Sequence, residues 1–188
     1  QRSDVLEHVV NELSTPERAQ LVEGVEGLAR LQADPRAAWL LGRPGLVDAL
    51  MRSGASLEPG QLLCEADVYS AVWNGLIRRH DTQPPGTTSP DDRSSTVVAL
   101  AGRRLGGTGS ANGQALRELR SDGVLRAESN PAFAVGPEFA TDLYRDFGLC
   151  RLFLESSWQP LKDAELPRWP IRAARLSCQA RLSVAEPG

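Results

Sequence analysis

The residues best suited to contact a ligand lie at a corner, Gly42-Arg43-Pro44, in the first quarter of the chain. Glycine has no side chain, so another group can approach its backbone closely. Proline offers an apolar ring and has no N–H to desolvate, so its ring can pack on the face of an adenine. The same residues are also typical of a plain connection, in which one helix ends at glycine and the next begins at proline. Both interpretations stay open on these residues alone.

A second stretch, Gly107-Thr108-Gly109-Ser110-Ala111-Asn112-Gly113, loosely resembles a dinucleotide-binding loop. Its spacing departs from that fingerprint, and it follows a predicted helix where the fingerprint follows a strand. We therefore expect a turn between two helices. The sequence also lacks the G-x-x-x-x-G-K-[ST] loop that cradles phosphates in P-loop ATPases. We expect the chain by itself not to be an enzyme and to have no catalytic residues.

The cysteines and histidines do not form a recognisable reactive or metal-binding pattern. Cys64, Cys150 and Cys178 are odd in number and far apart, and no C-x-x-C pair occurs. His8 and His80 have no nucleophile motif around them. We expect no metal site, and reduced, mostly buried thiols in a cytoplasmic protein.

Composition indicates a globular chain with one large domain or two small ones. Of the 188 residues, 41% are hydrophobic and 24% are charged, with a formal net charge of −3. This charge gives no overall attraction to nucleic acid or to an anionic membrane. No apolar run approaches the roughly 18 residues that span a bilayer. The start has neither a signal-peptide core nor an initiator methionine, so we expect an excised piece of a longer cytoplasmic protein.

The elements that position these residues are predicted to be mainly α-helical, because apolar residues recur at helical spacing through most of the chain. A helical lid-like domain is expected over residues 1–81 and a linker rich in Pro, Thr, Ser and Gly over 82–92. Its helices are predicted to start at Thr15 and to cover residues 35–41, 44–53 and 65–79.

After the linker, the pattern predicts a winged helix-turn-helix over residues 93–136, followed by a C-terminal helical segment over 137–188. Helices are expected at 92–105 and 112–121, a short β-hairpin has strands at 124–127 and 132–135, and further helices cover 137–154 and 167–182.

The order of these motifs resembles that of STAND-type P-loop NTPases, the NACHT and apoptotic-ATPase relatives, several of which act in bacterial signalling or anti-phage defence. The resemblance covers roughly residues 15–182 and rests on motif order and spacing more than on any single motif. The matching segments are Leu-Gly-Arg-Pro-Gly-Leu (41–46), Val-Tyr-Ser-Ala-Val-Trp (68–73), Phe-Ala-Thr-Asp-Leu-Tyr-Arg-Asp-Phe (139–147) and Pro-Arg-Trp-Pro-Ile-Arg-Ala-Ala-Arg-Leu (167–176).

The resemblance implies nucleotide contacts at two places. In that family the proline of a G-x-P motif lies against the bound adenine, which implies this role for Pro44, with Gly42 allowing close approach. The family's winged helix carries F-x-H-D, whose histidine contacts the β-phosphate of ADP and holds the protein closed. Here Phe139 and Asp142 keep the ends of that motif, and Thr141 stands in place of the histidine. A threonine hydroxyl can donate one hydrogen bond but is never cationic.

The function that the resemblance implies is that of a regulatory lid and winged-helix module. It would hold ATP or ADP only together with the ATPase core of the same polypeptide. Nucleotide exchange in that core would shift the module from a closed state to an oligomerising state, with a homo-oligomer as the active form. No membrane contact is expected.

One alternative is a winged-helix regulator that binds DNA through Arg117, Arg120 and Arg126 on or just after the second helix of the motif. Glu118 and Asp122 are expected to interrupt this basic face, and the negative net charge disfavours nucleic acid as a partner.

Another alternative is a helical protein-interaction scaffold. The four tryptophans are spread widely and are typical of core or interface anchors. They are Trp39, Trp73, Trp158 and Trp169.

Overall fold

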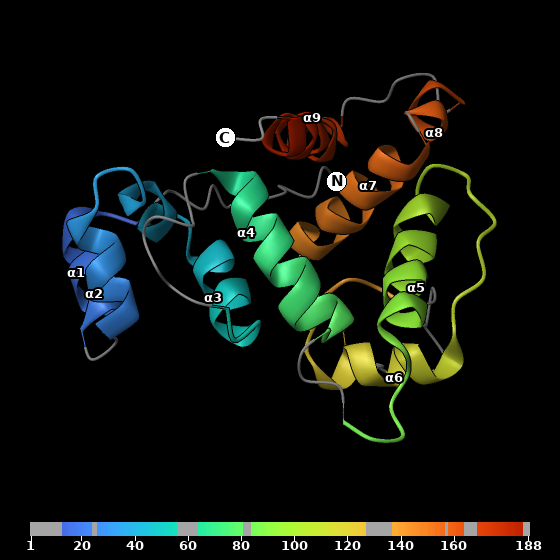
Figure 1. Ribbon diagram of the computed structural model, residues 1–188, viewed down its shortest axis with the longest axis horizontal. Coiled ribbons are helices and arrows are strands. Elements are labelled where there is room, and N and C mark those ends of the chain that lie inside the picture. Colours follow the sequence, from blue (N-terminus) through green and yellow to red (C-terminus); the bar gives the residue numbers. More distant parts are fainter. Residues whose placement is uncertain are drawn as a thin grey trace, which may run out of the picture.

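The chain folds as a helical protein in the computed structural model (Figure 1). The structure describes residues 13–23, 26–55, 64–80, 84–126, 137–156, 158–163 and 169–185. The predicted mainly α fold is confirmed: within these ranges no strand forms, and β-structure is limited to an isolated antiparallel bridge between Leu125 and Phe139. No helix in the described part of the chain is long and apolar enough to cross a bilayer.

The described residues between 13 and 55 form short helical elements. They are α1 (Thr15–Val22), α2 (Glu26–Ala33), the 3-10 helix η1 (Ala38–Gly42) and α3 (Pro44–Arg52). Ser14 caps α1 in a capping box, in which the backbone N–H of Ser14 donates to a Glu17 carboxylate oxygen at 2.7 Å. The helix predicted over residues 35–41 is instead a 3-10 turn that begins at Ala38, whereas α3 begins at the predicted Pro44.

The long helix predicted over residues 65–79 is present as α4 (Glu65–Val72), which continues into the π-helical η3 (Trp73–Arg78). Gly75 allows this helix to approach the end of α3. A Cβ atom added at Gly75 would lie 2.2 Å from the carbonyl oxygen of Ser53, which no side chain tolerates. The helix ends at Arg79, which adopts a left-handed conformation with φ of 52°.

The remaining helices are α5 (Pro90–Arg103), α6 (Gly113–Ser121), α7 (Asp142–Ser156), α8 (Gln159–Asp163) and α9 (Ile171–Ala185). Side-chain caps fix two of their starts, since Ser89 accepts from the N–H of Asp92 and Asn112 accepts from two N–H groups of the first turn of α6. Gly148 of α7 lets α5 pack closely, because a Cβ atom there would lie 2.8 Å from that of Ala101.

The β-hairpin of the predicted winged helix does not appear in the described residues. Residues 124–126 pair with 138–140 instead: the N–H of Arg126 donates to the carbonyl of Glu138 at 2.8 Å, and that of Ala140 to Val124 at 3.0 Å. The predicted return strand at 132–135 lies outside the described residues. The helix predicted to begin at residue 137 begins at Asp142, because the backbone just before it is used in this pairing.

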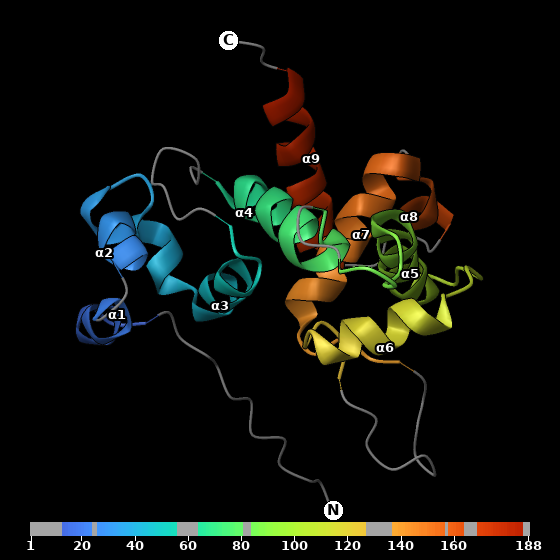
Figure 2. The same cartoon turned by 60° about the horizontal axis from the view of Figure 1, so that its bottom comes forward.

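One cluster of buried apolar side chains extends across both sides of residues 82–92. It includes Leu50, Ile77, Val97 and Phe147. In Figures 1 and 2, α1 to α3 lie together at one side, and α4 with η3 lies between them and α7 and α5. Helix α9 packs against α7 and α4, and Figure 2 shows its C-terminal end projecting away from them. The starts of α3, α4, α7 and α9 are thereby gathered in one region of the molecule.

Candidate functional site

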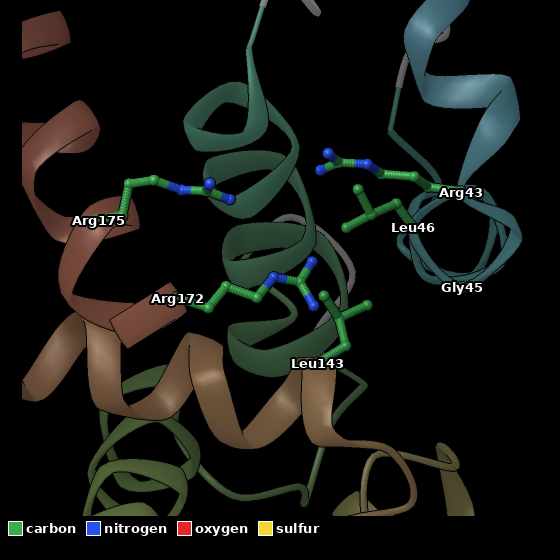
Figure 3. A pocket seen from close by; sticks show the side chains of 6 residues that line it. All are labelled: Arg43, Gly45, Leu46, Leu143, Arg172 and Arg175. Atoms are coloured by element: carbon green, nitrogen blue, oxygen red, sulfur yellow. The ribbon is translucent and has the colours of Figure 1, made fainter. Parts of the chain in front are cut away.

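A cavity of about 330 Å³ lies where these helix starts converge (Figure 3). Its walls combine three arginines with small or apolar residues. They are Arg43, Gly45, Leu46, Leu143, Arg172 and Arg175. The first three come from the corner at the start of α3, Leu143 from the start of α7, and the last two from α9.

The Gly42-Arg43-Pro44 corner is built as a helix-to-helix connection. Gly42 is buried as the last residue of η1, and the N–H of Arg43 donates to the carbonyl of Leu40 at 2.9 Å. Pro44 is the first residue of α3 and is exposed. The corner contributes to the cavity through Arg43, Gly45 and Leu46, while Gly42 and Pro44 are not among its lining residues.

The second motif, residues 139–142, leads directly into α7. Phe139 is half-buried in the β-bridge, and Thr141 is exposed just before the helix. The Asp142 carboxylate, 82% exposed, accepts a hydrogen bond from Arg145 at 2.9 Å. The motif reaches the cavity through the next residue, Leu143. The structure therefore brings the two predicted segments together through neighbours of Pro44 and Thr141, and not through those two side chains.

A buried carboxylate organises the three arginines. Glu65, the first residue of α4, is only 6% exposed and forms ion pairs with Arg172 at 2.5 Å, Arg175 at 3.3 Å and Arg43 at 3.4 Å. Burial by itself would raise the pKa of Glu65, but the hydrogen bond and charge of Arg172 and the charges of the other two arginines outweigh it, so the net shift is downward. Glu65 is therefore ionised at neutral pH.

Arg172 also faces a second buried acid. Asp146 of α7 is 4% exposed, accepts from Arg145 at 3.0 Å and lies 4.0 Å from Arg172. Burial raises the pKa of Asp146, and the hydrogen bond from Arg145 and the charge of Arg172 only partly oppose it. Glu65 and Asp146 together fix Arg172 between α4 and α7.

A second opening, of about 290 Å³, lies beside two of these arginines, Arg43 and Arg175. It is lined by Trp39, Arg43, Cys64, Glu65, Arg175 and Gln179. The guanidinium of Arg43 lies over the Trp39 ring, 5.5 Å from its centroid. This cation–π contact gives Arg43 a second partner besides Glu65.

Sequence reasoning did not identify Glu65, Arg172 or Arg175 as site residues. Arg172 and Arg175 are three residues apart, which places them on one helix face. No local pattern, however, predicts that they meet Glu65, which lies 107 residues before Arg172.

The arginines named for the DNA-binding alternative lie apart from this cavity. Arg117 is exposed on α6, Arg120 is half-buried, and the exposed Arg126 pairs with Glu138 at 3.5 Å. They do not form part of the cavity at α3, α7 and α9.

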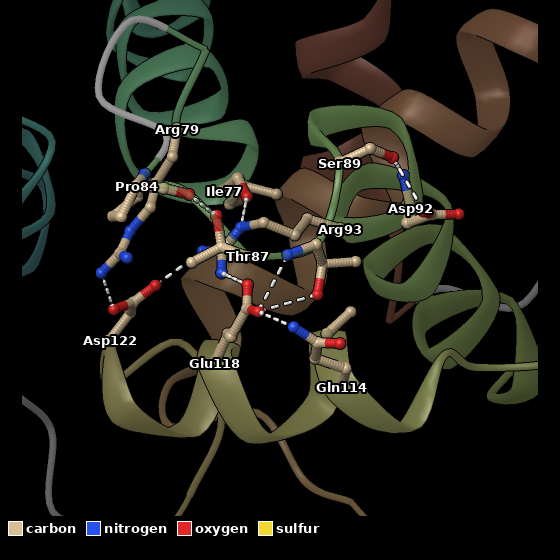
Figure 4. A network of polar contacts seen from close by, with 12 residues as sticks. Ile77, Arg79, Pro84, Thr87, Ser89, Asp92, Arg93, Gln114, Glu118 and Asp122 are labelled. Atoms are coloured by element: carbon tan, nitrogen blue, oxygen red, sulfur yellow. Dashed lines mark hydrogen bonds and ion pairs between the residues drawn. The ribbon is translucent and has the colours of Figure 1, made fainter.

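The acids of α6 do not interrupt its outer face as predicted, because both point inward to Arg93 (Figure 4). Arg93 of α5 is 1% exposed and donates to Glu118 at 3.1 Å and Asp122 at 2.6 Å. It also donates to the carbonyls of Ile77 at 2.7 Å and Leu76 at 3.0 Å. Arg93 thereby joins the end of η3 to α6.

Of the tryptophans, Trp73 is buried, Trp39 and Trp158 are half-buried, and Trp169 is 42% exposed with Arg145 over its ring. The thiols also differ, since Cys150 is buried, Cys64 half-buried and Cys178 exposed. Among the described residues, no group of three or more His, Cys, Asp or Glu side chains is placed to hold a metal ion.

Comparison with known proteins adds no relative to this picture: no protein-family model, curated protein or solved structure matches the chain.

Proposed function

We propose that the chain is the helical lid and winged-helix module of a STAND-type NTPase, which helps to hold a nucleotide and switches between a closed and an oligomerising state. One observation carries the proposal. One arginine-lined cavity is lined both by neighbours of Pro44 and by Leu143, the residue that follows the motif at 139–142, about 95 residues later in the chain. These residues belong to or directly follow the two segments from which the family resemblance implies nucleotide contacts.

The chemistry of the cavity suits ADP or ATP. Guanidinium groups are the preferred partners of phosphate oxygens, because their N–H donors match phosphate geometry and carry charge. Leu46 and Leu143 add an apolar surface on which a base or ribose can lie. When bound, the nucleotide would place its phosphates among the arginines of the α3 start and α9 and its apolar part near Leu143 at the α7 start. The rest of the nucleotide pocket would belong to an ATPase core.

The switch follows from this position between elements. A ligand that contacts both the α3 start and the α7 start stabilises the arrangement in which they face one another, and its loss removes that preference. The partners proposed are the ATPase core of the same polypeptide and, in the active state, further copies of it, in the cytoplasm. The module is not proposed to hydrolyse ATP itself.

The test begins with the native coding region upstream of Gln1, where a G-x-x-x-x-G-K-[ST] loop within about one domain length is expected. Pro44 is exposed beside the lining residues Arg43 and Gly45, so a bound base that extends past them can lie on its ring. In the complete polypeptide, Pro44→Ala should therefore weaken ADP binding about fivefold, as expected for loss of roughly 1 kcal/mol of apolar contact. Pro35→Ala, at an exposed proline in the turn before η1, is the matched control. A polypeptide that has no such loop and binds no ADP would contradict the proposal.

Duplex DNA binding is kept as a second candidate because the acids of α6 face Arg93 and leave Arg117 exposed on the outer side. Fluorescence anisotropy with duplex DNA at low salt tests it. Binding that weakens with salt at a slope of several phosphate contacts, and that Arg117→Gln reduces, would support it. A flat titration would exclude it.

A further inference from the structure

We infer that Arg43, Arg172 and Arg175 form a binding site for a phosphoryl anion, in which Glu65 holds the three guanidinium groups in position. This inference deepens the proposed function and rests on it for the identity of the natural ligand, a nucleotide. It differs from the contact that the family resemblance implies, because it gives the phosphate to arginines of the α3 start and α9 and not to Thr141.

The first argument is the number of hydrogen-bond donors. Each guanidinium carries five N–H donors, so the three arginines offer about fifteen, whereas a carboxylate offers about four acceptor sites. Within the described ranges, Glu65 is the one acid that forms ion pairs with all three. Glu65 can therefore use only a minority of their donors, and the cluster keeps the capacity to bind a second anion.

The second argument is charge. Three arginines surround one buried carboxylate, which leaves an excess of two positive charges. Asp146, at 4.0 Å from Arg172, accepts a closer bond from Arg145 at 3.0 Å. Arg145 also pairs with Asp142, but that carboxylate is 82% exposed and is screened by solvent. A group with two negative charges, such as a phosphoryl group, matches the excess.

The third argument is access. The side chains of Arg172, Arg43 and Arg175 are 35%, 40% and 61% exposed, although the carboxylate they share is buried. In Figure 3 they reach towards α4 from two sides, Arg43 from the start of α3 and the other two from α9. Cavities of about 330 and 290 Å³ open on the cluster, so a ligand can reach the unused N–H groups.

The fourth argument is preorganisation. Arginine side chains lose rotamer freedom when they bind a ligand, and this cost is smaller when they are already held in place. Glu65 contacts all three, Trp39 lies under Arg43, and Asp146 lies beside Arg172. Solvated surface arginines lack such support, so the cluster differs from an ordinary charged face.

The experiment uses the chain itself with inorganic pyrophosphate as the probe. Calorimetry measures the binding affinity, and the NMR signals of the arginine Nε–H groups report which arginines contact the probe. Pyrophosphate should bind and shift the signals of the three arginines. Arg175→Gln should weaken binding on the order of fivefold, from the loss of one nearby charge in a largely solvated site. Arg175→Lys should retain part of the affinity, because it keeps the charge and loses the fork of donors. Arg151→Gln is the control, because it removes a partly exposed arginine that pairs with Glu155 and lines neither cavity, and it should have no effect.

Arg175 is the main test position because it is the most exposed of the three, so its loss should disturb the fold least. Arg43→Gln is the second variant and should also weaken binding. Failure of pyrophosphate to bind the folded wild-type chain, or equal binding by wild type and both glutamine variants, would overturn the inference. Either result would leave the Pro44 contact with ADP in the complete polypeptide to be judged on its own experiment.

Parallel titrations with ADP and adenosine identify the source of the phosphoryl group. ADP that binds more tightly than pyrophosphate supports a nucleotide ligand. Equal affinities support a site that accepts any diphosphate. Adenosine that binds as well as ADP would contradict the phosphoryl site, because adenosine carries no charge for the arginines.

Discussion

Replacing Arg93 by methionine tests how strongly the end of η3 is joined to α6. Methionine keeps most of the apolar stem and removes the guanidinium, which is 1% exposed and donates to two carbonyls and two carboxylates. Removing one partner from a buried ion pair commonly costs about 3–5 kcal/mol.

The contacts that remain place the expected loss near the lower end of that range. Asp122 keeps its ion pair with Arg79, and Glu118 keeps hydrogen bonds from Thr88 and Gln114. The carbonyls of the last turn of η3 lose the charged donor. We therefore expect the free energy of unfolding to fall by about 3 kcal/mol.

Urea unfolding followed by far-UV circular dichroism at neutral pH measures this loss. Arg103→Met is the matched control, because Arg103 lies on the same helix, is exposed, and donates to the exposed carbonyl of Gly109 at 3.1–3.2 Å. A loss for Arg93→Met within about 1 kcal/mol of the control would refute the reasoning, since a buried guanidinium would then contribute no more than a surface one.

Three further predictions concern single positions. Burial by itself would raise the pKa of Glu118. Hydrogen bonds from the backbone N–H and hydroxyl of Thr88, and then from Gln114 and Arg93, outweigh burial and lower this pKa from 4.5 to about 2. The ionised Glu118 therefore stabilises the fold fully above about pH 4.5, and this contribution, on the order of 2–3 kcal/mol, is lost as the pH falls towards 2. In urea unfolding, Glu118→Gln should make the free energy of unfolding depend less on pH between about 4.5 and 2. Gly75→Ala should destabilise by about 2–4 kcal/mol in urea, because its Cβ would meet a backbone carbonyl, whereas Gly113→Ala, with open space at the Cβ position, should cost less than about 0.5 kcal/mol. In the complete polypeptide, Thr141→His should leave ADP affinity the same at about pH 6 and at about pH 8 in calorimetry, because Thr141 is exposed and does not line the cavity; a gain in affinity at about pH 6 would instead place an imidazolium at the phosphate.

Local chemistry explains which parts of the fold were predictable from the sequence. The start of α3 at Pro44 and the continuous helix from Glu65 follow from proline placement and apolar spacing, which act within a few residues. The pairing of Leu125 with Phe139 was not predicted, because which extended segments pair depends on how they pack against the rest of the molecule and not on their own sequence alone.

The candidate site was predictable only in part, for the same reason. Pattern and resemblance indicated the segments around Pro44 and Thr141, and their neighbours do line one cavity. The residue that organises this cavity, Glu65, resembles any acid in the first turn of a helix. Its importance depends on arginines more than 100 residues later, so it becomes visible only when the helices are placed in space.

The buried contacts of Arg93 with η3 and α6 limit where the molecule can bend. Residues 82–92 have the composition of a flexible connector. Arg93, just after them, nevertheless donates hydrogen bonds both to carbonyls of the last turn of η3 and to the carboxylate of Glu118 on α6. We therefore expect α6 and the end of η3 to move together as one rigid body. Between the start of α3 and the start of α7, by contrast, the ion pairs run through the partly exposed side chains of Arg43 and Arg172. Solvent screens such pairs more than the buried ones of Arg93, so motion is expected to be easier across the cavity.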